Sequence, residues 1–183
     1  VTAILRDASQ QLQKQIENLL AFNLAMAEDM IAAPVPVELD GLIKEIMEKQ
    51  ALLARSRNVR IVEHLKPVTV MGDPDKLGTV FDNLFSNAIK HSPQGGTIGI
   101  RIQEKHREAV FDIMDEGSGI DEADKERIFD AFYQGRREAS GHVKGTGLGL
   151  AISERLIGLH NGSIALIDST KGAHFRVTLP VDG

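Results

Sequence analysis

The order of the elements predicted along this chain favours an α+β fold. We expect a two-layer sandwich, a mixed sheet packed on helices, preceded by a long N-terminal helix. Helical and strand patterns mix without a regular βαβ repeat, which argues against a doubly wound fold. Strand patterns also come in adjacent pairs, as in hairpins. With 183 residues, 42% of them hydrophobic and 26% charged, the chain is long enough for one good core plus an appended element.

Residues 2–33 predict one long helix, because they contain neither glycine nor proline and repeat apolar residues at alternating spacings of four and three. Leu20 and Leu24 widen this heptad seam, as expected for a helix in a bundle. Asn23 lies within it, where one polar residue can fix register. We expect a partner helix to bury the seam; the alternative is packing on the helix's own domain. The seam consists of Leu5, Ser9, Leu12, Ile16, Leu19, Asn23, Met26 and Met30.

A proline-containing connector separates this helix from the rest of the chain. Pro34-Val35-Pro36 ends the helix and predicts a short, stiff linker over residues 34–39. Asp40 is expected to cap a second helix and to begin the main domain, residues 40–183. Strands are predicted next, at residues 59–64 and 68–71. The apolar side of the second helix is expected to comprise Leu42, Ile43, Ile46, Met47 and Leu53.

A helix with two different faces begins at Asp73-Pro74, a capping residue followed by proline at the first helical position, and ends at residues 94–96. Asn83, Asn87 and Lys90 lie at i, i+4 and i+7 and project from its polar face. Two amides and an ammonium suit a Mg²⁺ ion that bridges to phosphate oxygens. Taken alone, the row is better explained as a solvated face. The opposite face is apolar and contains Leu77, Phe81, Leu84, Phe85 and Ala88.

The second half of the chain predicts hairpins, loops and two further helices. A hairpin with strands at residues 97–103 and 109–115 turns through charged residues. A glycine loop at residues 116–120 leads to a short helix at 121–129, and a polar segment at 133–144 is expected to be mobile. A helix at residues 148–160 is ended by Asn161-Gly162. The last strands are predicted at residues 163–168 and 173–179.

A carboxylate followed by two glycines marks the end of the second hairpin strand. Phe111, Ile113 and Asp115 point to one face of that strand, so Asp115 needs a donor such as the exocyclic amine of adenine. Gly117 and Gly119 let the backbone bend close to a ligand. An ordinary turn is the simpler alternative.

A triple-glycine loop leads straight into the helix at residues 148–160. Backbone N–H groups at a helix N-terminus bind phosphate through hydrogen bonds and the helix dipole, although a flexible hinge would have the same composition. The spacing is neither that of a Walker motif nor that of a dinucleotide fingerprint. Arg136, Arg137 and Lys144 lie on the preceding segment, where they could close over a polyphosphate or remain solvated.

The bulk composition of the chain argues against several classes of partner and binding site. A net charge of −5 argues against nucleic acid or an anionic membrane surface. The absence of cysteine excludes disulfides and thiolate metal sites and fits a reducing compartment. No apolar run approaches the length of a membrane span. Because the first residue is Val1, we expect a fragment of a longer protein or a processed product.

Four motifs in this order, at these separations, resemble the ATP-binding domain of sensor histidine kinases, within the GHKL ATPase superfamily. They are the polar helix, the Asp-x-Gly-x-Gly loop, the segment Phe129-Asp130-Ala131-Phe132 and the Gly-x-Gly-x-Gly loop. The resemblance covers about residues 37–180, with a loose match to the last glycine motif at Lys171-Gly172-Ala173. Residues 1–33 resemble the second helix of the dimerisation and phosphoacceptor domain, through residues 11–22.

The resemblance implies a role for each matching position, with ATP and Mg²⁺ as cofactors. Asn87, assisted by Asn83, would bind Mg²⁺, and Lys90 would touch phosphate, so these three residues form the expected catalytic set. The resemblance also implies a response regulator as partner and a homodimer formed through the helix bundle of the full-length protein. It further implies a cytoplasmic location for this fragment, with an inner-membrane sensor as the full-length protein. The remaining expected nucleotide contacts are His91 beside the nucleoside, Asp115 on the adenine amino group, Gly117, Gly119 and Ile120 around that pocket, Phe129 and Phe132 as anchors of the lid, and Lys144, Gly145, Thr146, Gly147, Leu148 and Gly149 around the phosphates.

One departure from the family limits the expected activity. None of the six histidines stands in an acceptor motif of the His-Glu-x-x-Thr-Pro type or on the first helix, so we expect nucleotide binding without autophosphorylation. A GHKL ATPase of the gyrase or mismatch-repair type is the runner-up, but such enzymes carry a glutamate base where this chain has Asn83, and an amide is no base at neutral pH. A non-catalytic nucleotide-binding or dimerisation module is the third alternative.

Overall fold

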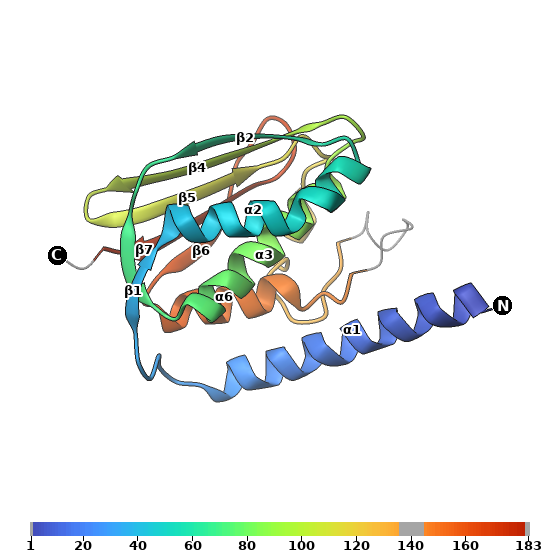
Figure 1. Ribbon diagram of the computed structural model, residues 1–183, viewed down its shortest axis with the longest axis horizontal. Coiled ribbons are helices and arrows are strands. Elements are labelled where there is room, and N and C mark those ends of the chain that lie inside the picture. The colour runs from blue at the N-terminus through green and yellow to red at the C-terminus, as the bar shows by residue number, and fades with distance from the viewer. Residues whose placement is uncertain (1, 136–144, 182–183) are drawn as a thin grey trace.

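The computed structural model describes residues 2–135 and 145–181, which form a five-stranded mixed sheet covered on one face by helices (Figure 1). The strand order is β2-β4-β5-β7-β6; β2 and β4 are parallel and the other neighbours antiparallel. The α+β two-layer arrangement predicted from the sequence is confirmed. The strands are β2 Arg60–Leu65, β4 Thr97–Lys105, β5 Glu108–Met114, β6 Ser163–Ile167 and β7 His174–Pro180.

Three helices form the second layer: α2 Leu39–Ser56, α3 Pro74–His91 and α6 Gly149–Leu159. In the core, the ring centroids of Phe81 and Phe85 lie 4.8 and 6.5 Å from that of Phe111 on β5. The start of α3 is as predicted, because the Asp73 carboxylate accepts hydrogen bonds from the next two free backbone N–H groups and Pro74 needs none. The helix that carries the predicted amide row is thus fixed at its start and along its apolar face.

A buried carboxylate fixes β5 from the sheet face opposite the helices. Asp112 follows Phe111 in the strand, so it points the other way, and its side chain is 0% exposed. It accepts hydrogen bonds from Arg101 on β4 (3.0 Å) and from His174 and Arg176 on β7 (2.6 and 2.8 Å). Burial by itself would raise the pKa of Asp112, but these three partners outweigh it and hold the pKa below its usual value. The cluster ties together the three strands around the end of β5, which carries Asp115.

Two predictions for the connector region are wrong in detail. Within the predicted short, stiff linker, residues 35–38 form a strand, β1 Val35–Glu38, which pairs antiparallel with β3 Thr69–Gly72. Asp40 is not the cap of α2: Glu38 is the N-cap, and Asp40 lies in the first turn. The cause is tertiary, because β1 leads directly into the helix and the backbone N–H of Leu39 donates to the carbonyl of Val68 (2.9 Å).

Two predicted helices are shorter in the structure. The predicted helix at residues 121–129 is a single turn, α4 Glu122–Lys125, after which the chain turns through i to i−3 bonds at Arg127 and Asp130. This path brings Phe129 against Phe175 of β7, with ring centroids 6.4 Å apart. The first helix, α1 Thr2–Ala27, ends six residues before the predicted end at residue 33. No helix within the described ranges combines the length and apolar character needed to cross a bilayer.

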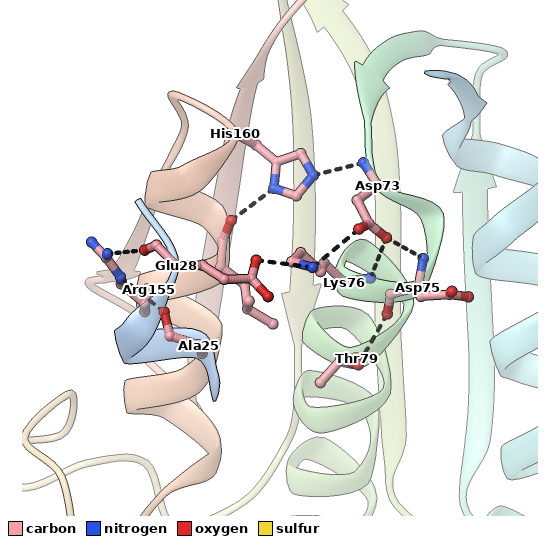
Figure 2. Close-up of polar contacts among 9 residues, drawn as sticks. Ala25, Glu28, Asp73, Asp75, Lys76, Thr79, Arg155 and His160 are labelled. Carbon is pink, nitrogen blue, oxygen red and sulfur yellow. Dashed lines mark hydrogen bonds and ion pairs between the residues drawn. The ribbon is translucent and has the colours of Figure 1, made fainter. Parts of the chain in front are cut away.

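The early end of α1 is explained by contacts with the main domain, which we call the α1 clamp: Glu28, Lys76 and Arg155 (Figure 2). Arg155 of α6 donates to the backbone carbonyls of Ala25 (3.1 Å) and Glu28, which would otherwise bond within a longer helix. The Lys76 ammonium lies 3.0 Å from the Glu28 carboxylate. The hydrogen bond that Lys76 donates to the Glu28 carboxylate raises the pKa of Lys76, so the lysine is charged at neutral pH. Both cations therefore lie at the C-terminal, negative end of α1.

The clamp and the predicted seam occupy different faces of α1. Ala25 is buried, and Ala21 and Phe22 pack against the core of the main domain. The seam residues at the described side-chain positions face solvent, which leaves the expectation of a partner helix as a prediction. Those exposed by more than 40% are Leu12, Ile16, Leu19, Met26 and Met30, together with Leu20 and Leu24, which widen the seam.

Breaking the clamp is expected to release α1 from the main domain. In the double variant Glu28→Gln/Arg155→Met, the amides of residues 18–27 should exchange hydrogen at least about tenfold faster, because charged hydrogen bonds of about 1.5–3 kcal/mol are lost. Exchange in the β-sheet should stay unchanged. Asp40→Asn, which removes the more exposed Lys44–Asp40 pair on α2, is the matched control. Unaltered exchange in residues 18–27 of the double variant would show that the clamp does not hold α1.

Candidate functional site

A cavity of about 130 Å³ lies between α3, α4, the loop after β5 and the start of α6. Its apolar lining suits a flat ring, and carboxylate, amide and imidazole groups converge on it. Asn87, His91, Asp115, Gly119 and Ile120 were predicted as nucleotide contacts, and all five line this cavity. The other lining residues are Ala88, Ser118, Asp121, Asp124, Ile128, Tyr133, Gly135, Leu150, Ala173 and Phe175.

Asp115 is held rigidly at one end of the cavity. Its Oδ1 accepts hydrogen bonds from the backbone N–H groups of Gly117 (2.8 Å) and Ala173 (3.1 Å), and its own N–H donates to the Ala173 carbonyl (3.0 Å). Since both bonds to the carboxylate end on Oδ1, Oδ2 remains for a donor in the cavity. Burial raises the pKa of Asp115 although the two N–H groups and His91 oppose the shift. This buried acceptor can receive a donor such as an exocyclic amine, and its assignment to adenine stays a prediction.

The loop between β6 and β7 supports Asp115, and sequence reasoning gave this loop little weight. Gly172 has a φ of +66°, and a Cβ placed there would lie 1.8 Å from the Asp115 carbonyl oxygen. Only glycine allows this close approach. Lys171 adds an ion pair to Glu116 (2.8 Å), which lowers the pKa of Glu116. This loop positions Asp115. Its only sequence signal was the loose match of Lys171-Gly172-Ala173 to the last glycine motif.

The predicted amide row on α3 divides into two parts. Asn87 and His91 line the cavity, whereas Asn83 contacts the start of α6: its Nδ2 donates to the Gly149 carbonyl (3.2 Å) and to the Ser153 hydroxyl (3.4 Å). Ser153 is fully buried and donates in turn to the Gly149 carbonyl (2.9 Å). Asn83 thus joins α3 to the glycine loop. Its amide oxygen is not used in these bonds and keeps its capacity to accept.

Lys90 and His91 complete the C-terminal turn of α3. Lys90 is half-buried and is not among the residues that line the cavity. The His91 carbonyl lies close to the loop after β5, since a Cβ at Gly117 would be 2.4 Å from it. The end of α3 and the loop after β5 therefore touch through backbone atoms, and Gly117 is required for that contact.

The glycine loop, residues 145–149, is braced on both sides. Gly147 has a φ of +70°, and a Cβ there would lie 2.7 Å from the backbone of Phe132 and Tyr133. Its carbonyl accepts from the Phe132 N–H (2.9 Å), and the Gly145 carbonyl accepts from the side chain of Gln134. Leu148 is buried and is the N-cap of α6, which begins at Gly149. The loop thus presents the N-terminus of α6 beside Leu150, which lines the cavity.

The predicted lid anchors lie outside the cavity, and one of them, Phe132, contacts α1. Phe129 packs on the sheet, but Phe132 is 61% exposed, and its ring centroid lies 6.0 Å from that of Phe22 on α1. Next to this contact, the Asn18 side chain donates to the Thr146 hydroxyl (3.4 Å). Helix α1 therefore touches both the Phe segment and the glycine loop. The predicted cations Arg136, Arg137 and Lys144 fall outside the described residues.

The arrangement suits a nucleotide better than a protein-only metal site. The described residues contain no cluster of three or more His, Cys, Asp or Glu side chains that could hold a metal. Asn87 and Asn83, four residues apart on α3, instead offer the kind of amide oxygen that Mg²⁺ accepts alongside phosphate oxygens and waters. Asp115 at one end and the N-terminus of α6 at the other fit a ligand with a base and phosphates.

Comparisons with known proteins agree with this geometry. Residues 72–183 match the family described as "Histidine kinase-, DNA gyrase B-, and HSP90-like ATPase". The chain is 33% identical over 181 residues to the sensor histidine kinase GlrK of Escherichia coli (strain K12), a match that covers 98% of this chain and 38% of GlrK. The chain therefore spans less than half the length of this curated relative.

Two solved structures share the fold over most of the chain. The mycobacterial sensor histidine kinase MprB superimposes with a TM-score of 0.72 at 28% identity, over 80% of this chain and 97% of the MprB chain. Full-length ShkA in complex with AMPPNP gives a TM-score of 0.84 at 25% identity, over 97% of this chain and 37% of ShkA. The larger coverage by ShkA extends over most of α1 as well as the main domain.

Proposed function

Because this chain belongs to the family of histidine kinase-, DNA gyrase B- and HSP90-like ATPases, with the ATP-binding domain in residues 72–183, we propose that it is the catalytic part of a protein-histidine kinase. In the proposed reaction, the bond between the γ-phosphorus and the bridging oxygen of ATP breaks, and a bond from phosphorus to an imidazole nitrogen forms. ADP leaves, and the imidazole loses its proton. The acceptor histidine lies outside residues 1–183, because none of the six histidines stands in an acceptor motif.

In the proposed complex, the adenine amino group donates to Asp115 Oδ2. The phosphates lie at the N-terminus of α6, where the glycine loop supplies backbone N–H groups, and Lys90 adds positive charge. Asn87, with Asn83, would hold Mg²⁺, whose charge would offset that of the phosphates. The rigid mounting of Asp115 and of Asn83 supports this assignment, since neither side chain needs to reorganise to receive a ligand.

The presence of asparagine at position 83 is the observation that favours phosphoryl transfer over ATP hydrolysis. Asn83 stands where hydrolytic relatives are expected to have a glutamate base, and its amide is committed to the Gly149 carbonyl and the Ser153 hydroxyl. An amide cannot take a proton from water at neutral pH. The protein is therefore expected to hold ATP intact until an acceptor imidazole, itself a nucleophile, reaches the γ-phosphate.

The exposed seam of α1 supports the proposed partners. Its apolar residues face away from the main domain, and residues 18 and 22 of the same helix contact the glycine loop and the Phe segment. In the full-length protein, we propose that this seam joins the acceptor helix in a dimeric bundle, which places the acceptor histidine near the phosphates. A response regulator is the proposed receiver of the phosphoryl group.

The test supplies the acceptor separately. A helical domain bearing the acceptor histidine, taken from a full-length kinase of this class, is mixed with the chain and γ-labelled ATP. We expect acid-labile label on the added domain, no stable label on the chain itself, and little phosphate release without the acceptor. Steady phosphate release without an acceptor would favour the gyrase-type alternative. Nucleotide binding without transfer or hydrolysis would favour a non-catalytic nucleotide-binding module, and no nucleotide binding at all would favour a dimerisation module.

Asn87→Asp tests the metal assignment. A carboxylate beside the phosphates adds a negative charge and changes the ligand set, so ADP affinity in Mg²⁺, measured by calorimetry, should fall at least about tenfold. Removing Mg²⁺ with EDTA should weaken ADP binding to the unmodified protein by a similar factor. Gln94→Glu, an exposed change of the same type beyond the end of α3, is the control. Equal ADP affinities of Asn87→Asp and the unmodified protein would remove Asn87 from the metal site.

A further inference from the structure

A second buried carboxylate lines the nucleotide cavity and has no role in the proposed chemistry. Asp124 lies on α4 and is 3% exposed. A buried carboxylate in a cavity that receives an anionic ligand is unfavourable unless it is hydrogen-bonded. The Tyr133 hydroxyl donates to its Oδ1 at 2.6 Å, the short distance of a charge-assisted bond.

Both oxygens of Asp124 face the segment of residues 133–135. A Cβ placed at Gly135 would lie 3.1 Å from Oδ2, so the backbone there approaches the carboxylate closely. On the tyrosine, the Arg127 guanidinium carbon lies 4.2 Å from the ring centroid, in cation–π geometry. The Tyr133 ring, which itself lines the cavity, is therefore restrained at its hydroxyl by Asp124 and at one face by Arg127.

These restraints matter because the backbone around Tyr133 is irregular. The segment 133–135 belongs to no helix or strand, and it follows Phe132, whose φ is +66°. The Tyr133 N–H donates weakly to the Asp130 carbonyl (3.2 Å). A side chain on such a segment keeps many rotamers unless another group holds it. The hydrogen bond to Asp124 supplies that restraint from α4, in addition to the backbone contact that the segment makes with Gly147 of the glycine loop.

We propose that Asp124 is a positioning residue for nucleotide binding: it holds Tyr133 in place as a wall of the cavity, with Arg127 as its second support. The inference rests on the proposed function, since the ring is held for the base of a bound nucleotide. An aromatic wall that is already ordered favours binding, because its side chain loses no further conformational entropy when the ligand binds. Asp124 does not touch the reacting atoms and acts only through the tyrosine.

A double-mutant cycle on the Asp124–Tyr133 pair tests the proposal, with Mg²⁺-ADP as the probe in calorimetry. Asp124→Ala and Tyr133→Phe should each weaken ADP binding about tenfold, as expected for one charge-assisted hydrogen bond of about 1.5 kcal/mol. The double variant should be no weaker than either single variant, because both changes remove the same bond. Asp124→Asn keeps an oxygen acceptor and should restore ADP affinity to within about threefold. Glu126→Gln, on the exposed neighbouring residue, is the control.

A spectroscopic readout separates positioning from general stability. Tyr133 is the only tyrosine of the chain and there is no tryptophan, so the tyrosine band in near-ultraviolet circular dichroism reports on this ring alone. Asp124→Ala should lose that band while keeping the thermal midpoint within a few degrees, and Asp124→Asn should keep it. Losses of ADP affinity that add in the double variant, or an intact tyrosine band in Asp124→Ala, would overturn the proposal. If the unmodified protein binds no ADP, that result contradicts the proposed function, whereas it does not contradict the hydrogen bond between Asp124 and Tyr133.

Discussion

Replacing Asp115 by asparagine is expected to weaken ADP and ATP binding about 100-fold while raising the thermal midpoint of the nucleotide-free protein. Oδ1 must accept from the N–H groups of Gly117 and Ala173, so the new NH₂ group takes the place of Oδ2. There it meets the adenine amino group donor to donor. The opposite amide orientation would turn the NH₂ group toward the two backbone donors. Either way, at least one buried donor loses its acceptor, at a cost of about 1–3 kcal/mol for each donor.

The gain in stability has a separate cause. Burial raises the pKa of Asp115, so the folded state binds its proton more tightly than the unfolded chain does. The ionised carboxylate therefore destabilises the nucleotide-free fold at neutral pH. That cost falls as pH decreases through the folded-state pKa toward the unfolded value of about 3.9. Asparagine carries no charge at any pH, so its advantage should be present at pH 7 and shrink toward pH 4.

Calorimetry and thermal unfolding between pH 4 and pH 7 check both halves of this expectation. Asp121→Asn, at another carboxylate that lines the cavity but is only half-buried, serves as the control. A midpoint difference between Asp115→Asn and the unmodified protein that stays constant over this pH range would contradict the assigned cause. Unchanged ADP affinity would contradict the assignment of Asp115 to adenine. The two measurements can fail independently, so each tests one claim.

Features of the fold that depend on local sequence were predictable. The start of α3 needs only Asp73, Pro74 and the next two N–H groups, all adjacent in the sequence. The hairpin of β4 and β5 follows from alternation of apolar residues and a charged turn. The end of α1 was not predictable in this way, because the group that takes over its carbonyls, Arg155, lies 130 residues after Ala25 in the sequence.

The candidate site shows the same division. Asn87, His91 and Asp115 belong to recognisable motifs, and the structure places all three around one cavity. Asp124 and Tyr133 carry no motif: an acidic residue in a first helical turn usually serves the helix dipole, and a single tyrosine in a polar segment has many explanations. Their pairing exists only because the chain folds back after α4. Residues that act by positioning another side chain, such as Asp124, could therefore be identified only from the structure.

Among alanine substitutions at the described glycines, Gly172→Ala is expected to destabilise the protein most. The φ of +66° disfavours alanine, and the added Cβ would lie 1.8 Å from the Asp115 carbonyl oxygen and 2.5 Å from its carbonyl carbon. Backbone atoms cannot swing aside as a flexible side chain can, so the loop between β6 and β7 must shift. We expect a loss of about 3–5 kcal/mol in the free energy of unfolding and a thermal midpoint lower by roughly 10 °C.

Gly158→Ala provides a matched control with the opposite sign. Gly158 lies inside α6, and the position that an alanine Cβ would take there has open space within 4 Å. Alanine should therefore leave the free energy of unfolding unchanged or raise it by about 0.5–1 kcal/mol. Gly172→Ala should also lose ADP affinity at temperatures where it is still folded, because the displaced loop takes the Ala173 N–H away from Asp115. If Gly172→Ala kept full ADP affinity, the loop would be a structural support only. If its midpoint matched that of Gly158→Ala, the close approach to Asp115 would be wrong.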